Sequence, residues 1–182
     1  VFDIQTHRKM LSISFLLAIM MVIALGWSSH VASKYGEIGF IAHTIHFFGV
    51  SVWIGLLLVT GWFAKDHRNW LPFLKWYTPL SILCVTSVLF TGWLITQYLV
   101  PQYVGSWVLP YGQTLLIKHL LIIPLLFFAS YNGFFIKRKL QLNPQYNPLT
   151  WVRAEGVITL FIFTITGYLG QQSPPHDVVL TL

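Results

Sequence analysis

The chain has 182 residues, of which 55% are hydrophobic, 16% aromatic and only 9% charged. Soluble domains carry roughly 25% charged residues, so this composition excludes an ordinary soluble domain and predicts a protein that faces lipid. The formal charge of +6 does not indicate nucleic-acid binding, because Lys and Arg form short clusters between apolar runs. The single cysteine, Cys84, excludes an intrachain disulfide and any paired-cysteine metal or redox motif.

Five apolar runs are long enough to cross the hydrocarbon core of a bilayer, which takes roughly 20 helical residues. In chain order they are Met10–Trp27, Gly39–Phe63, Tyr77–Val100, Gln113–Ile136 and Trp151–Gly170. Turn and stop signals separate the runs. We therefore predict an all-α polytopic membrane helix bundle with about five transmembrane helices. It forms a single transmembrane domain over residues 1–182, in the lipid bilayer of a bacterial inner (plasma) membrane.

The first run admits two interpretations. Arg8 and Lys9, an apolar stretch and the segment "SSHVAS" resemble a signal peptide that is cleaved after Ala32. The apolar stretch is long for a signal peptide, however, and Gly26 with Trp27 is an unusual approach to a cleavage site. These features favour a retained transmembrane helix.

Orientation follows from the positions of the basic residues, because cytoplasmic loops are enriched in Lys and Arg. With five spans, every basic cluster falls on one side of the membrane. These clusters contain Arg8, Lys9, Lys65, Arg68, Lys75, Lys137, Arg138, Lys139 and Arg153. The first loop on the other side has only Lys34, and the third loop and the C-terminal tail have neither Lys nor Arg. We predict that the N-terminus lies inside and the C-terminus outside.

Histidines gather toward the predicted outer side. His43 and His46 form a His-x-x-His pair, and this spacing puts both side chains on one helix face. At 1.5 Å per residue, His46 lies about 10 Å from the outer end of its run, and His119 lies at a similar depth of about 9 Å in the fourth run. His30 in the first outer loop and His176 in the tail lie on the same side.

Such a set of imidazoles indicates a metal entry site, since imidazole suits copper, zinc, iron and nickel. Asp177 could orient one of the imidazoles or supply an oxygen ligand. The alternative for His119 is an interhelical hydrogen bond, and for His30 and His176 a plain surface position. Lys118 either extends outward toward the interface or repels a bound cation.

Other polar residues favour structural roles. Cys84 and the Thr91-Gly92 pair are typical of close helix packing. Arg153 and Glu155, at the inner start of the last helix, are expected to anchor that helix or to form a pair. Asn132 is expected to hydrogen-bond between helices.

Three segments resemble one known family. "HTIHFFGVSVWIGLLL" resembles the signature helix of the copper resistance protein D (CopD) family, with its His-x-x-His and Trp-Ile-Gly. "YGQTLLIKHLLIIPLLFFASYNGFFIKRKL" resembles that family's Lys-His helix, which ends in a basic loop. "WVRAEGVITLFIFTITGYLGQQSPPHD" resembles its last helix, with an Arg-x-Glu start and a Pro-Pro-His end. The resemblance covers residues 38–176.

The resemblance implies a copper-handling membrane protein, active in copper import or copper resistance, and not an enzyme. By position, the copper ligands it implies are His43, His46, His119 and His176. Fuller members of the family have more transmembrane helices, and some carry a fused extracytoplasmic copper-binding domain. The shorter chain is therefore expected to work as a homo-oligomer or with a separate extracytoplasmic copper carrier.

Two other functions remain open. In the first, His46 and His119 are the axial ligands of haem b, in a cytochrome-like protein or a haem-pathway oxidoreductase, since bis-histidine haem takes one ligand from each of two helices. No histidine in the inner half of a helix is available for a second haem near the other face, which disfavours this hypothesis. In the second, the chain is a scaffold subunit whose histidines only bond between helices.

Overall fold

The computed structural model describes residues 4–63, 70–99, 109–143 and 145–172, and it contains no strand within these ranges. The elements, in chain order, are α1 (Ile4–Trp27), α2 (His30–Leu58), the π-helix η1 (Val59–Phe63), α3 (Trp70–Leu99), α4 (Pro110–Ser130), the π-helix η4 (Tyr131–Phe135), α5 (Ile136–Leu142) and α6 (Leu149–Leu169). In the described ranges, five helical stretches are long and apolar enough to cross a membrane. The predicted all-α membrane bundle of five spans is therefore confirmed.

The predicted spans differ from the observed ones mainly at their starts. The second span begins at His30 instead of Gly39, and the third at Trp70 instead of Tyr77. The second and fourth spans continue without a break through their π-helices, and the fourth runs on through α5. Charged residues such as Lys34, Glu37 and Lys75 lie in the added stretches, so a search for uninterrupted apolar runs stops short of these helix starts.

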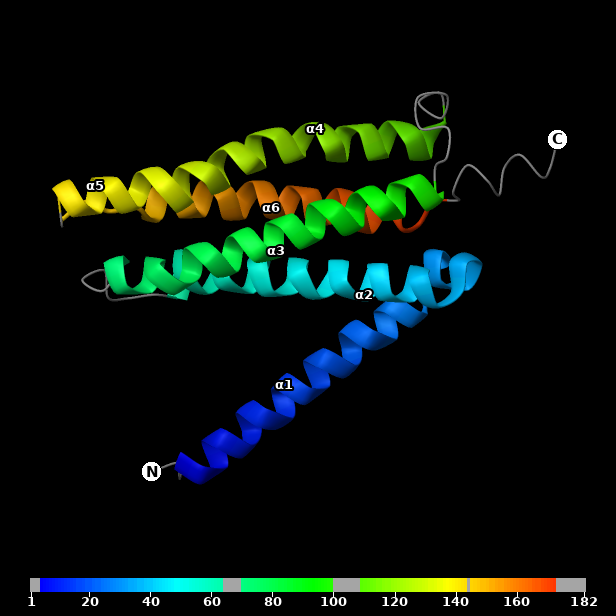
Figure 1. Ribbon diagram of the computed structural model, residues 1–182, viewed down its shortest axis with the longest axis horizontal. Coiled ribbons are helices and arrows are strands. Elements are labelled where there is room, and N and C mark those ends of the chain that lie inside the picture. The colour runs from blue at the N-terminus through cyan, green and yellow to red at the C-terminus, as the bar shows by residue number, and fades with distance from the viewer. Residues whose placement is uncertain (1–3, 64–69, 100–108, 144, 173–182) are drawn as a thin grey trace.

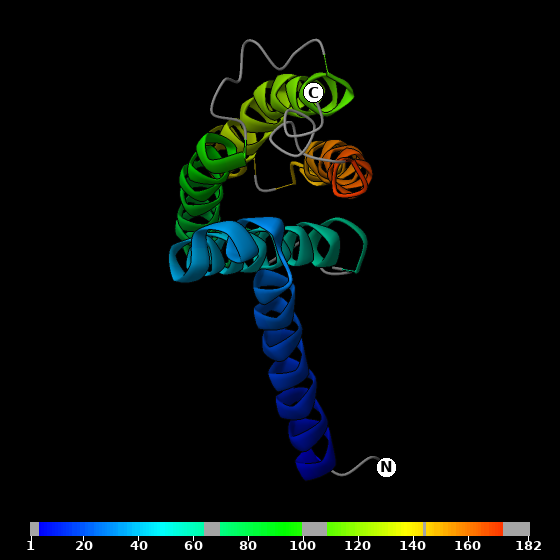
Figure 2. The ribbon, with the colours of Figure 1, turned by 90° about the vertical axis from the view of Figure 1, so that its right-hand side faces the viewer.

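Helices α2, α3, α4 and α6 lie side by side, whereas α1 leaves this group at an angle (Figures 1 and 2). Among the described side chains of α1, only those at its C-terminal end pack closely, with Gly26 against Thr44 and the ring of Trp27 5.4 Å from that of Phe40. Farther back along α1, large apolar side chains such as Phe15 are exposed. An exposed apolar helix is stable in lipid, which supplies its environment.

A sharp turn at Gly36 divides α2. Its backbone angles, φ 59° and ψ −134°, lie in a region that is essentially reserved for glycine. The preceding short helix begins at His30 and is capped by Ser29, whose Oγ accepts a hydrogen bond from the Ala32 N–H at 3.1 Å. Val31 of this short helix packs directly on Gly39, where a Cβ atom would lie only 2.7 Å from the Val31 carbonyl carbon.

The main hydrophobic core joins α2, α3, α4, α5 and α6. Its buried members are Trp53, Leu57, Trp70, Leu74, Tyr77, Cys84, Leu125, Ile136, Leu140, Leu149 and Val152. Cys84 lies in this core as a free thiol, which confirms its predicted packing role.

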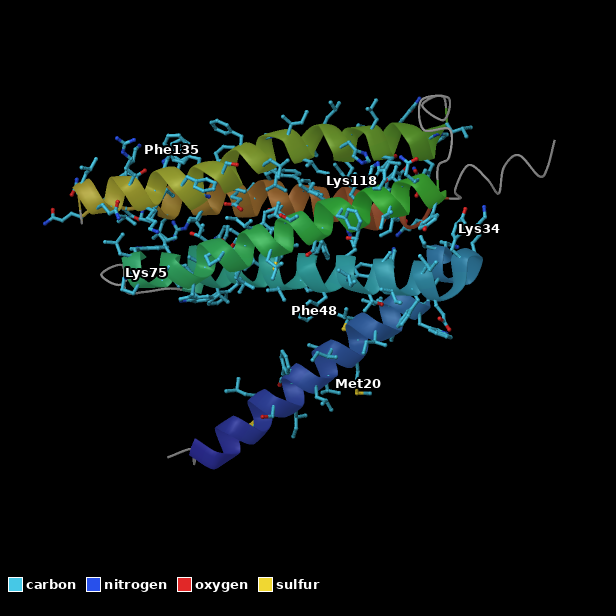
Figure 3. The ribbon with its side chains drawn as sticks, in the orientation of Figure 1. Met20, Lys34, Phe48, Lys75, Lys118 and Phe135 are labelled. Atoms are coloured by element: carbon cyan, nitrogen blue, oxygen red, sulfur yellow. The ribbon has the colours of Figure 1, made fainter. Side chains whose placement is uncertain are left out.

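The bundle has two chemically different ends. The basic end is where α3 starts, α5 ends and α6 starts, and it carries Lys75, Lys137, Arg138, Lys139 and Arg153. The histidine end is where α1 meets α2, α3 ends, α4 starts and α6 ends. Figure 3 shows Lys75 near the first end and Lys34 at the second. Lys65 and Arg68, from the same predicted cluster, lie outside the described residues, as do the side chains of Arg8 and Lys9.

Candidate functional site

A cavity of about 330 Å³ opens among α2, α3, α4 and α6 at the histidine end. Both His43 and His46 line it, because three residues of helix bring them to the same face of α2. The other polar residues on its wall are Ser28, Ser29, His30, Thr96, Tyr111, Lys118, Thr166 and Gln172. Thus residues from four of the five spans, together with Ser28 and Ser29 between α1 and α2, line a cavity that carries three imidazoles.

His46 is held in one orientation by α3. Its Nδ1 lies 3.1 Å from the Val88 carbonyl oxygen and 3.1 Å from Thr91 Oγ1. Thr91 Oγ1 itself donates to the Ser87 carbonyl oxygen at 2.6 Å, so toward His46 it acts as an acceptor. Because both neighbours accept, the proton belongs on Nδ1, and Nε2 retains its lone pair. This tautomer is the one a metal ion can use, and such support from a neighbouring helix is typical of metal-binding histidines.

Gly92 makes room for this imidazole. A Cβ atom at Gly92 would lie 3.2 Å from His46 Cε1 and 3.6 Å from its Nδ1. The Thr91-Gly92 pair therefore serves the close contact between α2 and α3 that was predicted. The structure adds a specific partner, because the contact is with His46 itself.

His43 differs from His46 in its hydrogen bonding. Its ring packs edge-on against Phe47, with 4.6 Å between the ring centroids. Its Nδ1 is buried and has no hydrogen-bond partner among the described residues. Gln172 Oε1, on the same cavity, is likewise buried without a partner there. Buried polar atoms are nearly always satisfied, so these two atoms mark places where a ligand can bind.

The other predicted ligands are placed differently. His119 donates from Nδ1 to the Leu115 carbonyl oxygen at 2.8 Å and is absent from the described lining of the cavity, whereas its neighbour Lys118 is present. One residue of helix rotates a side chain by about 100°, which directs His119 away from the His43 and His46 pair. His176 and Asp177 lie outside the described residues. Within the described ranges, no three His, Cys, Asp or Glu side chains are close enough together to hold one metal ion.

Lys118 points into the bundle instead of outward, between α4 and α3 (Figure 3). It lines the histidine cavity and also a second, mostly apolar cavity of about 90 Å³ that begins at His46 and extends past Trp53 to Thr159. Among the described residues no hydrogen bond or ion pair engages its ammonium group. A cation that moves from one cavity to the other passes this amine, and a proton on the amine raises the electrostatic cost of that passage.

A protein-family model of copper resistance protein D matches residues 71–169, which is more than half of the chain. The chain belongs to this family. No curated protein and no solved structure gives a significant match.

The family match is narrower than the resemblance predicted from the sequence. It covers α3 to α6, and with them His119, Lys118 and Glu155. It begins after His43 and His46 and ends before His176. Family membership therefore rests on the second half of the bundle, while the histidine pair is contributed by the preceding helix.

Sequence reasoning missed three residues that contribute to the site. Thr91 and Gly92 were assigned to helix packing, and their relation to His46 depends on the register between α2 and α3. Gln172 carried no signal in the sequence at all. The His-x-x-His spacing did predict that His43 and His46 lie on one face of α2 and so on one wall of the cavity.

Proposed function

We propose that this multi-pass membrane protein binds copper through His43 and His46 and moves it across the membrane, in copper import or copper resistance. The observation that carries the proposal is the cavity at the histidine end. It joins the two imidazoles, one oriented by α3 and the other with an unsatisfied nitrogen, in a chain of the copper resistance protein D family.

The donor set suits copper. A neutral imidazole with a free Nε2 is a good ligand for copper, and copper(II) accepts mixed nitrogen and oxygen ligands. Gln172 Oε1 supplies an oxygen on the same wall. His119 and His176 remain proposed ligands, and each joins the site only if its helix or tail turns toward the pair. We propose transport and not catalysis.

We further propose that the histidine end faces the outside of a bacterial inner membrane, with the N-terminus inside and the C-terminus outside. The support is the basic end, because Lys and Arg favour the cytoplasmic side. Reporter fusions at the C-terminus should be active only outside the cytoplasm. A C-terminal reporter active in the cytoplasm would overturn this orientation.

Metal content and the visible spectrum of the detergent-purified protein test the site. We expect near-stoichiometric copper in the wild type, loss of copper in a His43→Ala/His46→Ala double variant, and retention in His67→Ala, which removes a histidine from the basic cluster. Unchanged copper in the double variant would refute the site. The same spectrum tests for haem. A Soret band that is present in the wild type and absent from the double variant would show that the site binds haem b and not copper.

Copper accumulation in cells separates import from resistance. Expression of an importer raises cellular copper and copper sensitivity, whereas a resistance component lowers them. Both effects should disappear in the double variant. Uptake of free copper into proteoliposomes would further show that neither an extracytoplasmic carrier nor another subunit is required.

A further inference from the structure

A second polar cluster lies near the basic end, away from the histidines. A cavity of about 120 Å³ is lined there by Tyr77 and Thr78 of α3, Asn132 of η4 and Glu155 of α6. Glu155 is only 2% exposed and Asn132 only 4%. A buried carboxylic side chain within a membrane span is expensive, and such residues commonly lie on ion or proton pathways.

Among the described residues, no cation compensates the charge of Glu155. Asn132 Nδ2 donates to Glu155 Oε2 at 2.5 Å and to the Trp151 carbonyl oxygen at 3.2 Å, which confirms the predicted interhelical role of Asn132. Arg153, two residues from Glu155, donates its Nε to the Gly61 carbonyl oxygen at 2.8 Å instead. Within the described part of the chain no ion pair reaches the carboxylate. An uncompensated buried carboxylate is stable only when it takes up a proton or a cation.

Two further atoms in this cavity lack partners. Asn132 Oδ1 and Thr78 Oγ1 are both buried and make no hydrogen bond to any described residue. The cavity is large enough for water, which occupies about 30 Å³ per molecule in the liquid. Asn132 also lies in the π-helix η4, and such segments occur frequently at functional sites. The unsatisfied amide and hydroxyl oxygens thus mark an entry point for water at the carboxyl group.

The chemistry of this cavity suits a proton and not copper. The donors on this cavity are oxygens, whereas copper prefers sulfur or imidazole nitrogen. The neighbouring helices contribute Trp53 and Asn132, neither of which titrates, and Tyr77, whose phenol stays protonated at neutral pH. Glu155 is therefore the group on this cavity that exchanges a proton.

The apolar cavity lies between this cluster and the histidines. The apolar cavity that starts at His46 shares Val85 and Leu126 with the Glu155 cavity. It is also lined by Thr159, whose Oγ1 donates to the Glu155 carbonyl oxygen at 2.8 Å. A cation in the intermediate cavity favours the ionised carboxylate, and a proton on the carboxylate disfavours the cation.

We propose that Glu155, supported by Asn132, is a proton-binding site, and that copper movement through this protein is coupled to proton release from Glu155. Copper that enters the intermediate cavity displaces the proton, which leaves through water held in the cavity beside Asn132 and Thr78. The coupling rests on the proposed copper function, whereas the proton site does not depend on it.

Infrared difference spectroscopy without copper tests the proton site. The wild type should show the carbonyl stretch of a protonated carboxyl group that disappears as the pH is raised. Glu155→Gln should lack this band, and Glu37→Gln, which changes the exposed glutamate of α2, should retain it. A band that is the same in the wild type and Glu155→Gln, or no band in the wild type at any pH, overturns the site. If Glu155→Gln does not fold, Glu155→Asp replaces it: a shifted band supports the site, and an unchanged band refutes it.

Copper uptake into proteoliposomes, with and without a pH gradient, tests the coupling. The wild type and Glu37→Gln should respond to the gradient, and Glu155→Gln should lose the response while it still binds copper. Equal responses in the wild type and Glu155→Gln refute the coupling. A wild type that takes up no copper refutes the proposed function and the coupling with it, and the infrared band then decides the proton site alone.

Discussion

Replacing Gly39 by alanine tests how tightly the short helix before Gly36 packs on the rest of α2. The added Cβ would lie 2.7 Å from the Val31 carbonyl carbon and closer still to its oxygen. These are backbone atoms, so no side-chain rotation relieves the clash. The segment from His30 to Tyr35 must move away from Gly39, and with it the part of the cavity wall that carries His30 and Val31.

The magnitude follows from a comparison within the same helix. Overpacking of this kind typically costs about 1–3 kcal/mol. A glycine-to-alanine change inside a helix raises the free energy of unfolding by about 1 kcal/mol through helix propensity. Gly55, also in α2, has open space around its Cβ position, so Gly55→Ala gains the helix propensity without the cost of overpacking. The propensity gain cancels between the two variants, and Gly39→Ala should be less stable than Gly55→Ala by about 1–3 kcal/mol.

Reversible unfolding of the purified variants in mixed micelles, followed by circular dichroism, measures this difference. Copper binding on the same samples should weaken in Gly39→Ala and stay at the wild-type level in Gly55→Ala. Equal free energies of unfolding for the two variants would show that Val31 and Gly39 do not pack as described.

Two further substitutions probe the surroundings of the site. Thr91→Val removes one of the two acceptors that orient His46 and should weaken copper binding about 10-fold, as is usual for the partners of metal-binding histidines. Copper-binding isotherms measure this effect, with Thr164→Val, at an exposed threonine of α6, as the control. Equal weakening in both variants would contradict the role of Thr91. Gly36→Ala should lower the free energy of unfolding by about 1–3 kcal/mol through backbone strain alone, because its Cβ would meet no neighbour. Gly167 also has open space around its Cβ position but lies within a regular helix, so Gly167→Ala should not be destabilised. A similar loss of unfolding free energy in both variants would exclude backbone strain as the cause.

Membrane insertion, the number of spans and the sharing of one wall by His43 and His46 were all determined by the sequence itself. The physical reason is that each depends on local quantities. A span needs a run of apolar residues of sufficient length, and a shared helix face needs only a spacing of three. The Lys and Arg pattern likewise predicted one basic end, since it depends on loop order and not on packing.

Only the tertiary structure decided which side chains meet. The sequence put His119 at the same depth as the pair, but the rotation of α4 turns Lys118 to the cavity in its place. It left open whether Arg153 and Glu155 pair, whereas packing assigns Arg153 to Gly61 and Glu155 to Asn132. Contacts between helices depend on rotation and register, which the apolar pattern of a lipid-facing helix does not specify, because lipid accepts apolar side chains all around the helix.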